Sequence, residues 1–350
     1  MKYSLIIPVY NRPDEVDELL ASLEAQTMKD FEVVIVEDGS TIPCQHIVKE
    51  HASGLVLRYY VKPNSGPGQS RNYGAERSQG EYLIVLDSDC VLPPGYLQAV
   101  DDELQNNPCD AFGGPDRAHE SFTPVQKAIN YSMTSFFTTG GIRGGKKKLD
   151  KFYPRSFNMG IRADLYRRLG GFSAMRFGED IDFSIRIFQS SASCRLFPEA
   201  WVWHKRRTDL KKFFKQVHNS GIARINLWKR HPGSMKLVHM LPAVFTLGMA
   251  FLATICVAAA VFGAINFNNA KGAYGLCVAL CSLIPGLLFS LLIFTDSLIN
   301  NRSIKVAWLS IWASFIQLLG YGTGFIRAWW LRCVCSRNEE LQAFKDNFYK

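Results

Sequence analysis

Three short apolar runs near the start of the chain each end in a group of polar side chains. Residues 4–10 lead to Asn11, residues 31–36 lead to Glu37-Asp38-Gly39-Ser40, and residues 82–86 lead to Asp87-Ser88-Asp89. Apolar positions at helical spacing between the first two runs predict an amphipathic helix over about residues 14–26. This order of strand, helix and strand predicts an α/β fold with a mixed, mainly parallel sheet.

A different hydrophobic pattern follows residue 236. Apolar stretches at residues 237–266, 273–294 and 306–328 each reach the roughly 20 residues that cross a bilayer core. We therefore predict about three transmembrane helices within residues 237–332, followed by a polar tail at 333–350. Counted as three spans, the stretches place the tail opposite the N-terminal domain, an orientation that Arg327, Arg332 and Arg337 do not fit. The alternative is that one stretch is re-entrant or lies in the interface.

Positive charge is concentrated before the first apolar stretch. The 350-residue chain has a formal net charge of +9, and basic runs include Lys146-Lys147-Lys148 and Lys205-Arg206-Arg207. Residues 210–230 mix cations with aromatic side chains, which predicts a basic amphipathic interfacial segment at 210–236. The nine cysteines lack metal-site spacing, so we expect free thiols in a reducing compartment.

Asp87 and Asp89 carry the most specific chemical signal in the chain. They end an apolar strand, and open α/β sheets bind their ligands at the carboxyl ends of strands. Carboxylates suit Mg²⁺ or Mn²⁺, which are usually held by one or two protein carboxylates while substrate phosphates complete the coordination. A polar loop in which one Asp caps the next turn is the alternative.

Further motifs follow in a defined order. A Gly-rich segment spans residues 64–75, Asn158 begins another short segment, and Gly178-Glu179-Asp180 precedes a helical pattern. Together with the three strand ends, these motifs resemble the inverting family-two glycosyltransferases with a GT-A fold over about residues 3–230. The resemblance implies a GT-A catalytic domain at residues 1–209 that binds a nucleotide sugar and a divalent Mn²⁺ or Mg²⁺ ion.

The resemblance also implies roles for individual residues. Asp89 and Asp87 are expected to hold the metal, with His204 as a further ligand. Contacts to the nucleotide sugar are expected from Pro8, Val9, Tyr10, Asn11, Asp38, Asn64, Arg71, Asp87, Ser88 and Asn158. Structural alternatives stay open: Pro8 could only end a strand, Tyr10 could be a core residue, Arg71 could pair with a surface acid, and His204 could belong to a solvated basic patch.

Direct displacement at the anomeric carbon requires a base that deprotonates the acceptor hydroxyl. By resemblance this base is Asp180, and Glu179 orients it or touches the acceptor. Residues 181–187 are expected to form a helix in which Asp182 and Arg186 pair at i,i+4. The alternative is that both acids only favour a helix N-terminus.

The predicted function is transfer of one sugar from a UDP- or GDP-sugar to a lipid-linked or membrane-associated acceptor. The protein is expected in the bacterial inner membrane with its catalytic domain in the cytosol, because the first apolar run is too short for a signal peptide. Nucleic acid is not an expected partner. Processive polysaccharide synthases of the family carry an Arg-Trp pair that residues 216–224 lack. Such a synthase is the alternative enzyme. An inactive nucleotide-sugar-binding scaffold is the alternative from another class of protein.

Overall fold

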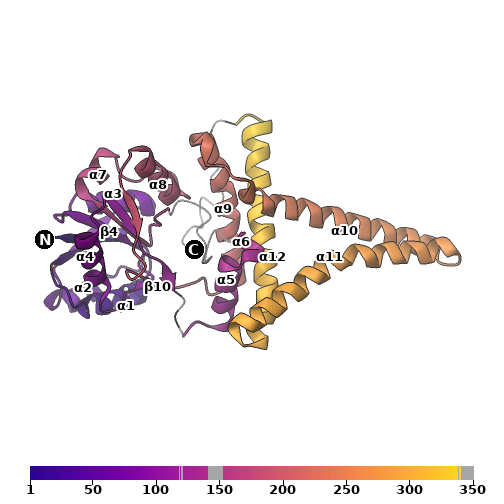
Figure 1. Cartoon of the computed structure of the whole chain (residues 1–350), viewed down its shortest axis with the longest axis horizontal. Helices are drawn as coiled ribbons and strands as arrows, with labels where there is room; N and C mark the ends of the chain where they lie inside the picture. The colour runs from indigo at the N-terminus through magenta and orange to yellow at the C-terminus, as the bar shows by residue number, and fades with distance from the viewer. Residues whose placement is uncertain (118, 120, 141–152, 338, 340–350) are drawn as a thin grey trace. The chain divides into compact units, whose positions relative to one another are not determined.

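The computed structural model describes residues 1–117, 119, 121–140, 153–337 and 339. The described residues form two compact units (Figure 1). The first contains those of 1–121 and 150–205, and the second contains those of 122–149 and 206–343. The basic run Lys146-Lys147-Lys148 lies outside the described residues.

The first unit is built on a seven-stranded sheet with the order β3-β2-β1-β4-β8-β6-β9. Its strands are β1 (Tyr3–Val9), β2 (Phe31–Asp38), β3 (Leu57–Lys62), β4 (Tyr82–Leu86), β6 (Ala111–Gly113), β8 (Asn158–Arg162) and β9 (Cys194–Leu196). The first four strands are parallel, and β8 runs antiparallel to β4 and β6. The predicted mixed, mainly parallel sheet is therefore confirmed.

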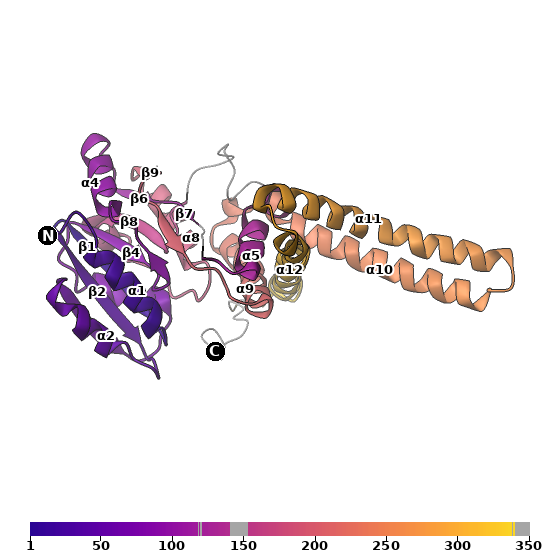
Figure 2. The ribbon, with the colours of Figure 1, turned by 90° about the horizontal axis from the view of Figure 1, so that it is seen from below.

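Helices cover both faces of this sheet (Figures 1 and 2). One face carries α1 (Pro13–Glu24), α2 (Gln45–Glu50) and α4 (Tyr96–Asn106), and the other carries α3 (Pro67–Ala75), α7 (Ala163–Arg168) and α8 (Glu179–Gln189). Alternation along β1 supplies both cores, because Leu5 and Ile7 join the first while Ile6 joins the second.

The strand order decides where the polar strand ends meet. Strand β1 lies between β2 and β4 and is parallel to both, so the residues after all three strands reach the same edge. A second, three-stranded sheet has the order β5-β10-β7, with β5 (Cys90–Val91), β10 (Val202–His204) and β7 (Asp116–Arg117). Because β5 directly follows Asp89 and pairs with β10, this small sheet brings His204 to the same edge.

The second unit consists of helices. They are α5 (Pro124–Thr134), α6 (Phe136–Thr139), α9 (Leu210–Arg230), α10 (Leu241–Ile265), α11 (Ala270–Asn301) and α12 (Ile304–Trp329), which continues into a π-helical turn at Trp330–Val334. Three of them, α10, α11 and α12 with its extension, are long and apolar enough to cross a membrane. The expectation of three long apolar helices is confirmed.

Helix α5 belongs to the helical unit, although the predicted boundary at residue 209 placed it in the N-terminal domain. The physical reason is its apolar face, where Ala128 and Ile129 share a core with Phe213 of α9 and Val306 of α12. Helix α9, the predicted interfacial segment, likewise buries Phe213, Val217 and eight further residues. Much of its apolar face is thus used for packing between helices.

Candidate active site

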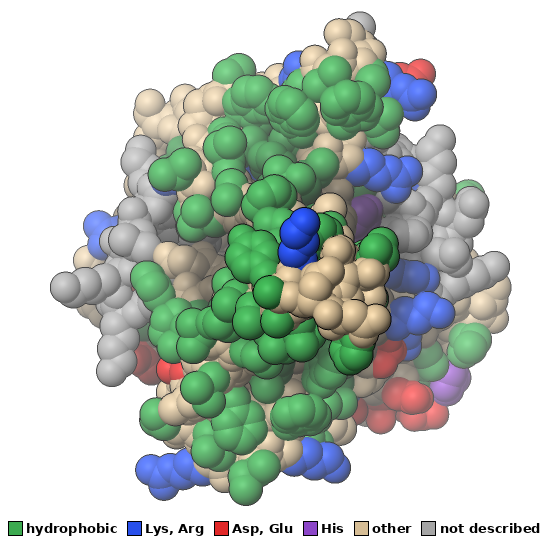
Figure 3. Space-filling model, turned by 90° about the vertical axis from the view of Figure 1, so that its right-hand side faces the viewer, with side chains coloured by type: hydrophobic (Ala, Val, Ile, Leu, Met, Phe, Trp, Pro, Cys, Tyr) green, Lys and Arg blue, Asp and Glu red, His purple; other side chains and the backbone are tan. Residues whose placement is uncertain are grey.

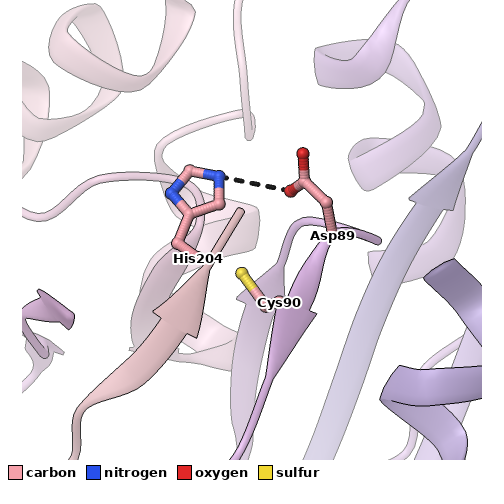
Figure 4. A group of neighbouring side chains, drawn as sticks. All are labelled: Asp89, Cys90 and His204. Atoms are coloured by element: carbon pink, nitrogen blue, oxygen red, sulfur yellow. Dashed lines mark ion pairs between the residues drawn. The ribbon is translucent and has the colours of Figure 1, made fainter. Parts of the chain in front are cut away.

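Asp87 and Asp89 follow β4, and Asp89 faces His204 at the end of β10 (Figure 4). The Oδ1 atom of Asp89 lies 3.2 Å from Nε2 of His204, and Oδ2 of Asp87 lies 3.9 Å from the same nitrogen. The structure therefore brings together the three residues that the sequence nominated as metal ligands, although they are separated by more than a hundred positions.

The donor set at this point fits a divalent cation. Asp89, Cys90 and His204 each offer one ligand atom, and these atoms lie within 4.8 Å of one another. Burial raises the pKa of the Cys90 thiol well above its usual range, and its Sγ lies 3.5 Å from the carbonyl oxygen of Phe157. A neutral thiol is a poor ligand for a hard cation, so the carboxylates and the imidazole form the set that suits Mn²⁺ or Mg²⁺.

Two charged residues that the sequence analysis did not nominate hold these ligands. Arg12 donates from Nη1 to Oδ2 of Asp89 at 2.9 Å, while Oδ1 of that carboxylate faces His204. Asp116 of β7 lies behind His204, with Oδ2 at 3.9 Å from Nδ1. Asp116 thus faces the ring nitrogen of His204 that is directed away from Asp89.

Arg71 of α3 connects the strand end to α8. Its Nη2 donates to Oδ1 of Asp87 at 2.8 Å and its Nη1 donates to Oε1 of Glu179 at 2.9 Å, and the Arg71 side chain is 3% exposed. Burial alone would lower the pKa of this guanidinium, but Asp87 and Glu179 together raise it above its usual value. Arg71 therefore pairs with two acids of the nominated site and not with a surface acid, which was the alternative left open.

Glu179 and Asp180 begin α8 and have different environments. Burial raises the pKa of Glu179 to about 7, although the neighbouring Arg71 lowers it, and Asp180 adds to the increase. Asp180 is more exposed, and its Oδ2 lies 3.4 Å from Nη1 of Arg155. The predicted helix is confirmed, and Arg186 donates to Asp182 at 3.0 Å as the spacing indicated.

The turn after β2 is fixed through Asp38. This carboxylate is buried, and it accepts hydrogen bonds from the backbone N–H groups of Ser65 and Gly66, both at 2.9 Å, and from Lys62. Asn64 donates from Nδ2 to the carbonyl oxygen of Asp38 at 2.7 Å. The loop that carries Asn64 is therefore tied directly to the end of β2.

Asn11 and Gly39 shape the same turn. Oδ1 of Asn11 accepts hydrogen bonds from the backbone N–H groups of Thr41 and Ile42 at 2.8 and 2.9 Å, which joins the end of β1 to the turn. Gly39 has φ +72°, and a Cβ atom there would lie 2.8 Å from the backbone nitrogen of Asn64. Only glycine fits this conformation and this close approach without strain.

The remaining nominated residues lie near this edge with different exposures. Pro8 and Tyr10 are half-buried at the end of β1, whereas Val9 and Ser88 are buried. Asn158 is fully buried: its Nδ2 donates to the carbonyl oxygen of Ala200 at 2.8 Å and its Oδ1 accepts from the Tyr96 hydroxyl at 2.6 Å. The predicted contact between Asn158 and a sugar would require this side chain to become exposed.

The signal that could have revealed Arg12 was the strand order. Arg12 follows Asn11 in the turn after β1, and β1 pairs with β4, which ends at the Asp87-Ser88-Asp89 segment. The order of parallel strands in a nucleotide-binding sheet would have placed the two turns side by side. Arg155 and Asp116 lie on short segments without a strong local pattern, and no sequence signal identified them.

Comparison with known proteins extends these observations. The model of the family described as Glycosyl transferase family 2 matches residues 4–170. A glycosyltransferase of Haemophilus influenzae is 32% identical over 193 residues, which cover 53% of this chain and 62% of that protein. The poly(ribitol-phosphate) beta-N-acetylglucosaminyltransferase TarS of Staphylococcus aureus is 40% identical over 93 residues, which cover 25% of this chain and 16% of that protein. This chain thus spans less than two thirds of either relative.

Among solved structures, the mannosyltransferase PcManGT from Pyrobaculum calidifontis, in complex with GDP-Man and Mn²⁺, has a TM-score of 0.56 at 15% identity. The match covers 94% of this chain and 87% of that one, and it supports the GT-A fold. The family match includes Asp38, Arg71, Asp87 and Asp89 and ends before Glu179. Residues 4–170, just under half of the chain, thus match the model of glycosyl transferase family 2.

Proposed function

We propose that this protein transfers one sugar, with inversion at the anomeric carbon, from a UDP- or GDP-sugar to a lipid-linked or membrane-associated acceptor. The observation that carries the proposal is the meeting of Asp87, Asp89 and His204 at one sheet edge, joined by Arg71 to the acidic start of α8. A metal-binding group on one side and a pair of carboxylates on the other are what displacement of a nucleoside diphosphate requires.

The proposed metal ligands are Asp89, His204 and Asp87. A bound Mn²⁺ or Mg²⁺ would supply positive charge for the leaving diphosphate, and one solved neighbour is in complex with GDP-Man and Mn²⁺. Arg12 holds one oxygen of Asp89 and leaves the other directed toward His204. These residues thus orient a carboxylate and an imidazole toward one point.

We assign the base to Asp180 and a positioning role to Glu179. Glu179 is committed to Arg71 inside the protein, whereas Asp180 is the more exposed of the two and is paired with Arg155 at 3.4 Å. A carboxylate that reaches the acceptor can take the proton of its hydroxyl as general base. The turns that contain Asn11, Asp38 and Asn64 would hold the nucleotide.

The acceptor class rests on the second unit. Helices α10, α11 and α12 are long and apolar enough to cross a membrane, so the enzyme would act next to a bilayer, where a lipid-linked acceptor presents its hydroxyl. Residues 210–236, which carry many cations, would add attraction to anionic headgroups. The inner membrane and a cytosolic catalytic domain remain part of this proposal.

The test uses the full-length protein in detergent with Mn²⁺ and a panel of UDP- and GDP-sugars, and it measures release of the nucleoside diphosphate. We expect Asp89→Ala to lower this rate roughly 10²-fold or more, because a metal stabilises the transition-state charge by several kcal/mol. The matched control is Asp102→Ala, which removes an exposed acid on α4. Binding of nucleotide sugar without any release would instead identify a non-catalytic scaffold, and full activity of Asp89→Ala would refute the metal site.

A further inference from the structure

Helices α10 and α11 form a hairpin whose surface requires an apolar environment. In the most apolar 18-residue window of α10, no residue is buried inside the protein. In the corresponding window of α11, 11% of the residues are buried. Exposed side chains include Leu247, Phe251 and Val257 on α10 and Leu287 and Leu291 on α11. At about 1.5 Å per residue, the 25 residues of α10 extend for about 37 Å, which is enough to cross a hydrocarbon core of about 30 Å.

Helix α12 meets the start of α10 and the second half of α11, where the Phe315 ring packs against Phe245 and Phe289. A Cβ atom at Gly322 would lie 2.0 Å from Oγ1 of Thr246 in the second turn of α10. The Ser297 hydroxyl near the end of α11 donates to the Ser310 hydroxyl at 2.8 Å. Figures 1 and 2 both show α12 crossing the base of the hairpin at a steep angle. Helices that span a bilayer as a bundle would instead run alongside one another.

The long packing partner of α12 is α9. A Cβ atom at Gly221 of α9 would lie 2.1 Å from the carbonyl oxygen of Tyr321, and one at Gly324 of α12 would lie 2.0 Å from that of His218. Gly320 and Gly324 form a G-x-x-x-G pair, which permits such close backbone approach. The contact continues to the end of both helices, where Arg332 donates to Asn226 at 2.7 Å. Helices α9 and α12 therefore form a parallel pair.

The opposite face of α12 is apolar and rich in tryptophan. Trp308, Trp312 and Trp329 are 58%, 55% and 43% exposed, and Ile304 is 72% exposed. At about 100° per residue, these side chains share one face with half-buried apolar residues in the middle of the helix. That face consists of Ile304, Trp308, Trp312, Phe315, Leu319, Ile326 and Trp329. Within it, Phe315 and Ile326 pack against neighbouring helices, and the tryptophans are the exposed part. In contrast, 44% of the most apolar window of α12 is buried inside the protein.

We propose that α12 lies in the plane of the membrane surface, with its tryptophan face in the boundary between headgroups and acyl chains, and that only α10 and α11 cross the bilayer. The hairpin sets the direction of the membrane normal, and a helix that crosses its base steeply must then run along the surface. A Trp-rich apolar face with cations beside it is typical of interfacial helices.

The charges around α12 fit this placement. Arg302, Lys305 and Arg327 are exposed on α12 or at its start, and Arg337 is exposed in the tail that follows. Figure 3 looks along the hairpin and shows hydrophobic side chains over much of this face, with one basic side chain near the centre and the others toward the margins. Two spans return the chain to the side where it entered, so these cations lie on the same side as the N-terminal unit. The positive-inside rule, which three spans violate, is then satisfied.

The sidedness of the tail tests the proposal in the full-length protein. Sealed membrane vesicles of one orientation are treated with a charged, membrane-impermeant maleimide, and labelled peptides are identified by mass spectrometry. Cys335 is exposed and reports the membrane side of the tail. Val61→Cys on β3 reports the side of the N-terminal unit, and Asn268→Cys reports the side of the hairpin tip. We expect Cys335 to react together with Val61→Cys and opposite to Asn268→Cys. Reaction of Cys335 together with Asn268→Cys would show that α12 spans, which overturns the proposal.

A depth measurement separates a surface helix from one that enters the bilayer and returns. A spin label at Leu319→Cys, in a background whose accessible cysteines are serine, reports the middle of α12, and a label at Leu283→Cys reports the middle of α11. We expect the Leu319 label about 5–10 Å below the headgroups and the Leu283 label near the bilayer centre. Equal, central depths for the two labels would refute the surface placement.

Discussion

Replacement of Glu179 by Gln should stabilise the protein at neutral and alkaline pH. The Glu179 side chain is 10% exposed and its pKa is raised to about 7 by burial, against an ordinary value of 4.5. An acid whose folded-state pKa is raised contributes stability below pH 4.5 that is lost as pH rises through about 7, because ionisation in the folded state is unfavourable. Gln keeps the acceptor oxygen for Arg71 and does not ionise.

The size of the effect follows from the shift. At about 1.4 kcal/mol per pH unit, a shift from 4.5 to about 7 corresponds to a loss of roughly 3 kcal/mol between pH 4.5 and 8. For a unit of this size, 1 kcal/mol moves the melting temperature by about 2–4 °C. The melting temperature of Glu179→Gln should therefore exceed that of the wild type by several degrees at pH 8 and by little at pH 5.

The assay is thermal unfolding of the full-length protein in detergent at a series of pH values, with the difference between variant and wild type as the measured quantity. Glu76→Gln is the matched control, because it removes the same charge from an acid whose side chain is 73% exposed. A difference curve for Glu179→Gln that is flat from pH 5 to 8, or that slopes like the control, would refute the argument. It would mean that Arg71 keeps Glu179 ionised throughout this range.

Two further changes test the site. Asp180→Asn should lower the rate of transfer by about 10²–10⁴-fold, because it removes the general base that acts on the acceptor. The dissociation constant for the nucleotide sugar, measured by calorimetry, should stay nearly the same. Loss of donor binding would place Asp180 in the donor site. Gly39→Ala should weaken nucleotide binding, since φ is +72° and the new Cβ would lie 2.8 Å from the Asn64 nitrogen. Gly95→Ala, which meets no atom within 4 Å, is its control, and equal binding by both variants would contradict this reasoning.

Local sequence patterns determined the elements and the main chemical groups of this protein. The apolar run 82–86 became β4, and the apolar stretches beyond residue 236 became long helices. Asp87 and Asp89 stood out because they follow directly on an uninterrupted apolar run. These features depend on hydrophobic periodicity and on the preferences of neighbouring residues, which act over a few positions.

The contacts between distant segments required the tertiary structure. Arg12 reaches Asp89 across 77 positions and Arg71 reaches Glu179 across 108, and both contacts exist because strand order and helix packing bring those segments together. The placement of α12 is a similar case. Like α10 and α11, it is long and apolar enough to cross a membrane. Its close approach to α9 at Gly324 and its steep crossing of the hairpin distinguish it from them. Hydropathy counts apolar side chains but not the direction of a helix, and that direction is set by long-range packing.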